Sequence, residues 1–182
     1  MEYRKNIRLK DGRECCIRNG VRGDGKAALE TFILTHAETD FLLTYPDENT
    51  FTPRMEDDFL QAKAENPVEA ELLAEVDGHV IGLAGFSSLG KSFKVRRRAE
   101  YGISLERDFW GIGAGKALTE ACIECARKAG YRQLELEVTA DNTRAMSMYR
   151  KFGFVEYGRN PRGFLKRDGI YQELVLMRLE LQ

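Results

Sequence analysis

The chain has 182 residues, of which 43% are hydrophobic and 31% charged, and its formal net charge is -1. This balance is typical of a soluble globular protein and gives no reason to expect nucleic acid or a membrane as a partner. No apolar run is long enough to span a bilayer, and the first residues contain no signal-peptide-like apolar stretch. We therefore expect one domain over residues 1–182, located in the cytoplasm.

Turn signals divide the first half of the chain into short elements. The Asp11-Gly12 and Asp77-Gly78 pairs are flanked by strand-like residues, which indicates two hairpins. The predicted elements are, in order, a hairpin over 6–17, helices over 25–38 and 54–65, and strands over 69–76, 79–89 and 95–105. Residues 1–20 are expected to form an N-terminal hairpin elaboration.

The pattern changes in the second half, where a glycine-rich turn over 111–115 leads into an amphipathic helix that is expected to end at Gly130. The elements predicted after it are a strand over 134–138, a helix over 143–151, and strands over 154–158 and 171–179. This order predicts an α/β fold. Its mixed, mostly antiparallel central sheet is flanked by helices and contains one strand–helix–strand unit.

Cys122 and Cys125 have the CxxC spacing of some redox and zinc sites. Both, however, lie on the apolar stripe of the predicted helix, which favours packing in the core. The stripe consists of Leu118, Ala121, Cys122, Cys125, Ala126 and Ala129. The only two histidines, His36 and His79, are distant in sequence from this pair, so we expect no metal site.

Three glycines precede the long helix, at Gly111, Gly113 and Gly115. Without Cβ atoms the backbone can curl and let a ligand approach its amides, and a helix N-terminus adds unpaired N–H donors and a positive dipole end. Together these features predict a phosphate-binding site. The spacing fits neither a P-loop nor a Rossmann fingerprint. A purely structural tight turn is the alternative at this point.

The segments AEYGISLERDFWGIGAGKAL, LELEVTADNTRAMSMYRKFGFVEYGR and DGIYQELVLMRL resemble the GNAT N-acetyltransferase superfamily over about residues 99–177. The family's glycine motif, Q/R-x-x-G-x-G/A, matches residues 110–115, although Trp110 stands where Gln or Arg is usual. The second motif matches Asn142, Ala145, Tyr149, Gly153 and Phe154. The resemblance implies the GNAT fold, with a sheet splayed in its middle, and an acetyl-CoA-binding core over 99–158.

The resemblance also implies where acetyl-CoA binds. Its pyrophosphate is expected on the amides of residues 111–116, and its pantetheine arm beside the strand that ends at Leu105, like an added strand. The implied cofactor-binding residues are Ile103, Ser104, Leu105, Gly111, Ile112, Gly113, Ala114, Gly115, Lys116, Asn142 and Tyr149. For Lys116 a solvated surface lysine is an equal alternative, and Asn142 also suits a helix N-cap.

Tyr149 and Glu100 are the two catalytic candidates. The family resemblance assigns Tyr149 to protonating the departing thiolate, and a phenol with a pKa of about 10 is protonated at neutral pH. Its alternative is a core aromatic. The attacking amine needs a base or a water chain, and Glu100 lies in the strand where relatives often carry a base. Its alternative is a surface glutamate. Amides near residues 103–105 are expected to stabilise the oxyanion.

These observations predict an N-acetyltransferase in which a primary amine of a small molecule or a peptide N-terminus attacks acetyl-CoA directly. A noncatalytic acyl-CoA sensor and, more remotely, a nucleotide-binding regulator are the alternatives. Seven acids and one base between residues 38 and 58 suggest a cationic acceptor or simply a solvated surface. The basic run over 91–98 suggests an exposed hairpin, with contact to the CoA 3′-phosphate or to an acidic partner as the alternative. Family members commonly form dimers, so the resemblance allows a homodimer.

Overall fold

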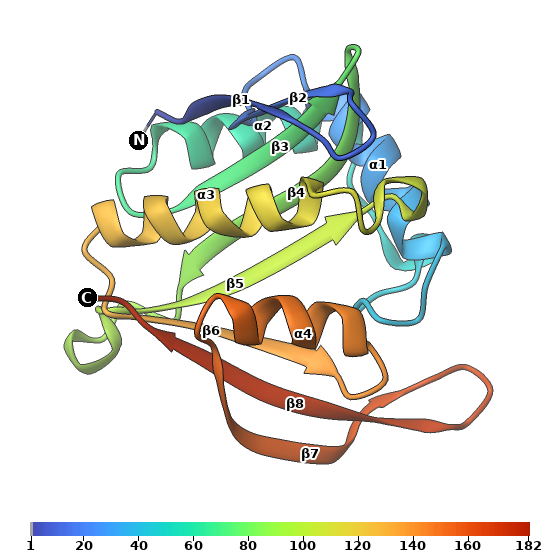
Figure 1. Ribbon diagram of the computed structural model, residues 1–182, viewed down its shortest axis with the longest axis vertical. Helices are drawn as coiled ribbons and strands as arrows, with labels where there is room; N and C mark the ends of the chain where they lie inside the picture. Colours follow the sequence, from blue (N-terminus) through green and yellow to red (C-terminus); the bar gives the residue numbers. More distant parts are fainter. Residues whose placement is uncertain (1) are drawn as a thin grey trace.

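The computed structural model describes residues 2–182 as an eight-stranded sheet with four α-helices (Figure 1). The elements are β1 (Arg4–Arg8), β2 (Glu14–Asn19), α1 (Gly25–Ala37), α2 (Pro53–Glu65), β3 (Ala70–Val76), β4 (His79–Ser88), β5 (Arg98–Leu105), α3 (Ala114–Lys128), β6 (Gln133–Thr139), α4 (Thr143–Lys151), β7 (Val155–Leu165) and β8 (Tyr171–Glu180). The strand order is β1-β2-β3-β4-β5-β6-β8-β7. Every neighbouring pair is antiparallel except β5 and β6, which confirms the predicted mixed sheet.

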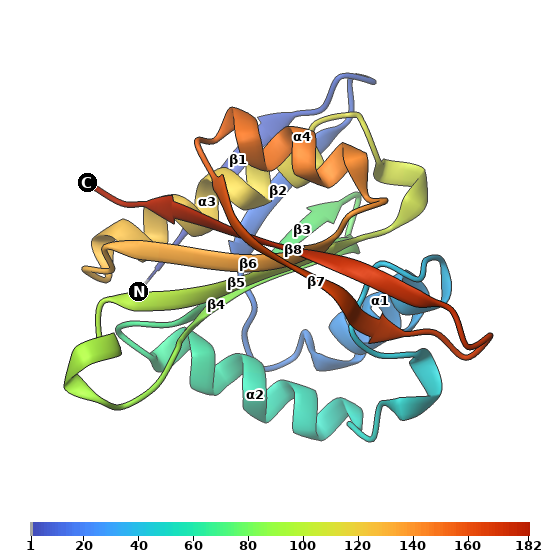
Figure 2. The same ribbon diagram turned by 90° about the horizontal axis from the view of Figure 1, so that it is seen from below.

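Helices cover both faces of the sheet. Helices α3 and α4 lie on one face, and α1 and α2 lie on the other (Figure 2). The larger core cluster lies under α3 and α4 and includes the predicted stripe of α3, with Cys122 and Cys125 both buried. The smaller cluster joins α1 and α2 to β3 and β4 through Ala28, Leu60, Leu73, Val80 and Leu83. The CxxC pair is therefore part of the core packing, as the stripe predicted.

Strands β5 and β6 separate along their length. They pair only from Arg98 opposite Gln133 to Glu100 opposite Glu135. Beyond Glu100 no further register pairs form, and the two strands diverge toward their C-terminal ends (Figure 1). One edge of β5 is thus left without a neighbouring strand, which confirms the predicted splay in the middle of the sheet.

The two predicted hairpins are present. Asp77 and Gly78 both have positive φ angles, 50° and 78°, as the tight turn between β3 and β4 requires. The N-terminal hairpin extends the sheet, because β2 pairs with β3.

Two strands differ from the prediction. Strand β5 begins at Arg98 because residues 93–95 form a short 3-10 turn. Strand β7 continues past Gly158 to Leu165, since a register irregularity between Asn160 and Phe164 removes Pro161 from the ladder.

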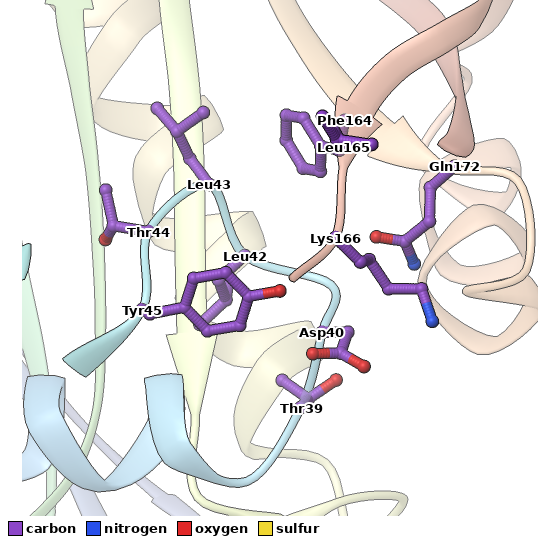
Figure 3. A pocket seen from close by; sticks show the side chains of 10 residues that line it. All are labelled: Thr39, Asp40, Leu42, Leu43, Thr44, Tyr45, Phe164, Leu165, Lys166 and Gln172. Atoms are coloured by element: carbon purple, nitrogen blue, oxygen red, sulfur yellow. The ribbon is translucent and has the colours of Figure 1, made fainter. Parts of the chain in front are cut away.

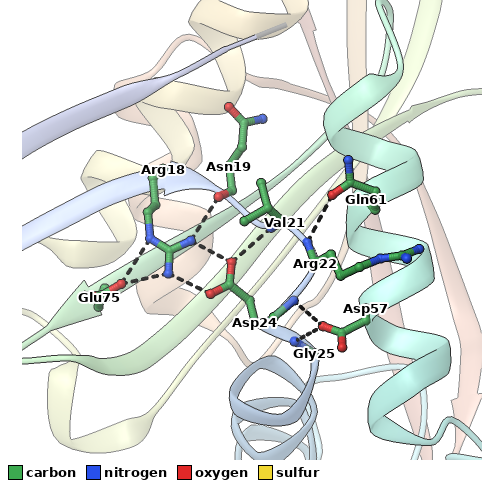
Figure 4. Close-up of polar contacts among 10 residues, drawn as sticks. Arg18, Asn19, Val21, Arg22, Asp24, Gly25, Asp57, Gln61 and Glu75 are labelled. Carbon is green, nitrogen blue, oxygen red and sulfur yellow. Dashed lines mark hydrogen bonds and ion pairs between the residues drawn. The ribbon is translucent and has the colours of Figure 1, made fainter.

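A polar network fixes α1 and α2 against the sheet (Figure 4). The guanidinium of Arg18 on β2 binds Asp24, just before α1, and Glu75 on β3. Asp57 of α2 accepts hydrogen bonds from the amides of Gly23 and Gly25, each at 2.7 Å, and so satisfies donors at the start of α1. None of the helices described over residues 2–182 is long and apolar enough to cross a membrane.

Candidate active site

The glycine turn has the backbone geometry of an anion-binding loop. Gly111 and Gly113 have φ angles of 81° and 114°, in the left-handed region, and Gly113 is the N-cap residue of α3. A Cβ added at either residue would meet nothing within 4 Å, so the surface above them is open. Alternating left-handed residues turn successive amides toward one side, which is the arrangement of a backbone anion nest.

The amides of this turn are free. Within residues 2–182, none of the N–H groups of residues 111–116 donates to a protein acceptor, whereas the next amide, that of Ala117, donates to the Gly113 carbonyl. The dipole of α3 places partial positive charge at the same end. Consecutive free amides at a positive helix end are the donors that a pyrophosphate group requires.

The N-terminal hairpin supports this turn. The Lys10 amide donates to the Ile112 carbonyl at 2.9 Å, and the Lys10 ammonium donates to the Gly111 carbonyl at 3.1 Å. Lys10 therefore adds a positive charge beside the free amides. Reasoning from the sequence did not find Lys10, because nothing in the local pattern of a hairpin turn indicates a contact 101 residues away.

Trp110, the departure from the family motif, has a defined structural role. Its indole N–H donates to the Leu105 carbonyl at 2.7 Å and so ties the turn to the end of β5. The guanidinium groups of Arg107 and Arg144 lie 5.7 and 5.2 Å from its ring centroid. Two further positive charges are thus held close to the turn. The Leu105 carbonyl, which accepts the indole hydrogen bond, is already engaged.

The unpaired edge of β5 leads from the glycine turn into the splay. Ile103, Ser104 and Leu105 on this stretch are all half-buried. The side chains of Ile103 and Leu105 lie beside Gly115 of α3 and Met148 of α4. An extended ligand bound in the splay would therefore meet main-chain groups along β5 and an apolar surface formed by both helices.

Tyr149 lies on α4 inside the core and is 6% exposed. Its ring packs edge-on against Tyr101, with centroids 6.2 Å apart, and against Phe154. Its hydroxyl forms no hydrogen bond within the described part of the chain, residues 2–182, and burial raises its pKa, so the phenol stays protonated. The ring therefore belongs to the core, and the hydroxyl has no protein partner among the described residues; its role as proton donor to the thiolate stays a prediction.

The other predicted cofactor residues are placed around this turn and helix α4. The Asn142 side chain accepts from the Ala145 amide at 3.2 Å and is the N-cap of α4, as predicted. Lys116 is exposed on the first turn of α3. The N–H groups of Ile112, Ala114 and Gly115 are among the free amides of the turn, and their contact with the cofactor stays a prediction.

Glu100 and Tyr149 lie on opposite faces of the sheet. Tyr101 and Ile103 pack on the α3–α4 side, so Glu100 points to the α1–α2 side, as its place in the alternation predicted. Glu100 is exposed and stands opposite Glu135, at the last paired position before the strands separate. Its role as the base stays a prediction.

Most acids of the segment over 38–58 accept hydrogen bonds, but only Asp47 and Asp58 form ion pairs within residues 2–182. Five of its seven acids accept hydrogen bonds. Backbone amides donate to three of them: that of Arg107 to Glu38, that of Tyr45 to Glu48, and those of Gly23 and Gly25 to Asp57. Guanidinium groups donate to the other two: that of Arg167 to Asp47 and that of Arg22 to Asp58. Only Asp40 and Glu56 have no hydrogen bond or ion pair within residues 2–182. Folding thus fixes the positions of most of these carboxylates and pairs two of them with arginine side chains.

A hollow of about 370 Å³ opens at the mouth of the splay. It is lined by Glu38, Thr39, Asp40, Phe41, Arg107, Trp110, Asp141, Lys166 and Gln172. An adjoining, smaller space separates the loop after α1 from the β7–β8 hairpin, with Asp40 and Tyr45 across from Lys166 and Gln172 (Figure 3). The walls carry both signs of charge. Over residues 2–182 no group of three or more metal-ligating side chains is found.

Comparisons with known proteins agree with this geometry. The model of the acetyltransferase (GNAT) family matches residues 32–154. A GNAT-family acetyltransferase from Streptococcus pneumoniae has a similar structure, with a TM-score of 0.87 and 28% identity over 91% of this chain and 99% of that one. A Salmonella typhimurium protein solved with acetyl-CoA shares the fold, with a TM-score of 0.81 and 21% identity over 92% of this chain and 94% of its own.

Sequence comparison adds a relative from Bacillus subtilis (strain 168), provisionally named as an alanine N-acetyltransferase of a ribosomal protein. It is 29% identical over 108 residues, which are 59% of this chain and 68% of that protein. Three further relatives are matched over only 18% to 49% of their own lengths. The family model covers well over half of the chain, and the chain therefore belongs to the acetyltransferase (GNAT) family.

Proposed function

We propose that this protein is an acetyl-CoA-dependent N-acetyltransferase whose acceptor is a primary amine of a small molecule or a peptide N-terminus. One observation carries the proposal: the free amides of residues 111–116 lie at the end of an unpaired strand edge, and an available phenol, Tyr149, lies on the helix beside it. A pyrophosphate, an extended amide-containing arm and a thioester sulfur would each meet suitable groups along this path.

The residues present fit acetyl-CoA. The pyrophosphate would accept hydrogen bonds from the amides of residues 111–116, with the ammonium of Lys10 beside them. The pantetheine arm would lie in the splay along residues 103–105, where β5 lacks a neighbouring strand. The Salmonella protein with the same fold was solved with acetyl-CoA, which supports the same cosubstrate here.

The bound cosubstrate supplies an activated acyl carbon, and the chain supplies orientation and proton transfer. Backbone amides near Ile103 to Leu105 would stabilise the negative charge that develops on the acyl oxygen. The Tyr149 hydroxyl would donate its proton to the departing sulfur; burial keeps that proton in place until the carbon–sulfur bond breaks. Holding amine and thioester together supplies much of the remaining acceleration.

Direct attack in a ternary complex is favoured over an acetyl-enzyme. Cys122 and Cys125 are buried in the α3 stripe, and burial raises the pKa of both thiols, so neither offers a thiolate to the acyl carbon. Initial-rate lines that intersect when both substrates are varied support this scheme, and parallel lines contradict it.

The acceptor is proposed to enter through the hollow at the mouth of the splay. Its walls combine acids such as Asp40 and Asp141 with the bases Arg107 and Lys166. Mixed charge of this kind favours a compact acceptor over a long polycation. We also propose that the protein is cytoplasmic and forms a homodimer.

The experiment is a panel of primary amines, amino acids and short peptides incubated with acetyl-CoA, with mass detection of the acetylated product and measurement of released thiol. We expect one class of amine to gain an acetyl group with equal release of CoA. Binding of acetyl-CoA without thiol release across the panel would favour the noncatalytic sensor. Binding of ATP without binding of CoA would contradict both.

A further inference from the structure

A second carboxylate, that of Glu71, lies on the same face of the sheet as Glu100. Glu71 is on β3, and its neighbour Leu73 belongs to the cluster under α1 and α2, so the Glu71 side chain points to that side. It is half-buried, and its carboxylate forms no hydrogen bond or ion pair within residues 2–182. A carboxylate without a partner at a partly buried position is costly, which indicates a role other than packing.

Two glycines connect Glu71 to the splay. In the register of the sheet, Glu71 stands opposite Gly85 of β4, and Gly85 stands opposite Gly102 of β5. A Cβ at Gly85 would collide with Oε2 of Glu71, so the carboxylate occupies the space that a side chain would otherwise fill. A Cβ at Gly102 would meet nothing within 4 Å. The surface is therefore open from the Glu71 carboxylate to the unpaired edge of β5.

The distance from the acyl site beside β5 to the Glu71 carboxylate suits transfer of a proton through water. Strands lie about 4.8 Å apart, so an acyl group bound beside β5 would be about 10 Å from a carboxylate above β4. An attacking nitrogen lies about 3 Å from the acyl carbon, and the remaining span holds one or two hydrogen-bonded waters. Glu100 lies two residues before Gly102 on β5, at the last position where β5 still pairs with β6.

The groups around Glu71 set its proton affinity. Burial raises the pKa of Glu71 to about 8; the Lys63 ammonium opposes this shift, and the Glu56 carboxylate adds to it, both from α2. Lys63 is itself bound to Glu69 and Ser87, at 2.6 and 2.7 Å. On the far side of the sheet Tyr101 and Cys122 are neutral, since burial raises both of their pKa values.

We propose that Glu71 accepts the proton of the acceptor ammonium through water lying over Gly85 and Gly102, an inference that rests on the proposed acetyl transfer. The ammonium gives its first proton to this water and so to Glu71, and the freed nitrogen pair forms the bond to the acyl carbon. The carbon–sulfur pair leaves with sulfur, which takes the Tyr149 proton. The second nitrogen proton passes through solvent to the Tyr149 oxygen and restores the phenol. Glu71 releases its proton to bulk water.

The test is the pH profile of kcat, from about pH 6 to about pH 10, with an amine identified in the panel, because kcat reports groups in the ternary complex. For the wild type we expect kcat to rise to a plateau with an apparent pKa near the value of about 8 set by the surroundings of Glu71. Glu71→Gln should remove this rise and lower the plateau by about 100-fold. Glu56→Gln should move the rise to lower pH, because it removes a like charge from beside Glu71.

Two further variants separate this role from a structural one. Gly102→Ala adds a methyl group where nothing lies within 4 Å, so it should fold normally and still lower kcat by displacing water. Glu65→Gln, on the exposed part of α2, is the matched control and should keep the wild-type profile. An unchanged profile in Glu71→Gln, or loss of the rise in Glu100→Gln alone, would overturn the inference while leaving the acetyl transfer intact. Absence of turnover by the wild type would overturn both.

Discussion

Lys10 and Gly111 are 101 residues apart in the chain, yet the Lys10 ammonium donates to the Gly111 carbonyl at 3.1 Å. The Lys10 amide binds the next residue of the turn, Ile112. A hairpin at the edge of the sheet thus holds the carbonyl side of the glycine turn, which leaves the amide side free. The orientation of the anion site depends on this long-range contact as well as on the local glycines.

Lys10→Met should weaken CoA binding about tenfold, because it removes the ammonium's hydrogen bond to the Gly111 carbonyl and one positive charge near the phosphates, while the backbone bond to Ile112 remains. Isothermal titration with CoA measures the effect. Lys128→Met, at an exposed position at the opposite end of α3 from the glycine turn, is the matched control and should bind as the wild type does. Equal affinity in the two variants would show that Lys10 takes no part in binding.

Tyr149→Phe should lower kcat by about 100-fold and leave the KM for acetyl-CoA nearly unchanged, because the ring packing remains and only the proton donor is lost. Steady-state kinetics with a turned-over amine provides the readout. Tyr101→Phe is the control: it also removes one buried hydroxyl, which contacts Thr119 at 2.9 Å, from the same aromatic group. If both variants lose the same activity, the phenol of Tyr149 has no special role.

Gly113→Ala should abolish CoA binding and destabilise the fold by about 1–2 kcal/mol, since its φ of 114° strains any residue with a Cβ. Gly115→Ala should cost much less, because Gly115 has no positive φ and the nearest atom to an added Cβ is 3.6 Å away. Thermal unfolding with and without CoA compares the two. Similar losses in both variants would contradict the assignment of the turn geometry to Gly113.

Asp57→Ala should destabilise the protein by about 1–2 kcal/mol, because it leaves the amides of Gly23 and Gly25 without their acceptor at the start of α1. Asp58→Ala removes only an exposed pair with Arg22 and should cost at most about 1 kcal/mol. Chemical denaturation of both variants measures the difference. An equal cost would mean that the bridge between the two helices adds no stability.

The contribution of Glu71 to the free energy of unfolding should fall as pH rises between about 4.5 and about 8, because the pKa of Glu71 is raised from 4.5 to about 8 in the folded protein. In this window the folded chain binds more protons than the unfolded chain at this site. The stabilising contribution of Glu71 is complete below its pKa in the unfolded chain and is lost as pH rises through its pKa in the folded chain. Between these two values, this contribution falls by at most about 1.4 kcal/mol per pH unit. Denaturation of the wild type and of Glu71→Gln across this range should show that the difference between their free energies of unfolding changes with pH; a constant difference would place the pKa of Glu71 near normal.

Much of the fold follows from local sequence patterns. The stripe of α3, the turn at Asp77-Gly78 and the end of α3 at Gly130 each depend on residues close together in the chain, and each is confirmed. The extent of β7 could not be predicted in this way. Its Asn160-Pro161 step resembles a turn, and only the pairing with β8 turns it into an irregularity within a longer edge strand.

In the candidate site, too, residues in local motifs could be predicted and residues placed by long-range contacts could not. The family motifs predicted the glycine turn, the splay and Tyr149, because these residues cluster in the second half of the chain. Lys10 and Glu71 escaped notice, since their importance comes from contacts with Gly111 and Gly85 that only the folded sheet creates. The composition of the acidic segment over 38–58 indicated its charge but not its contacts, since the partners of Glu38, Asp47 and Asp58 are brought to them only by folding.

A crystal structure of the protein with bound CoA tests the central claim most directly. The account predicts phosphate oxygens within hydrogen-bonding distance of the amide nitrogens of residues 111–116, with the sulfur end in the splay near the Tyr149 hydroxyl. A complex in which the diphosphate lies elsewhere, or in which those amide nitrogens contact only protein atoms, would contradict it.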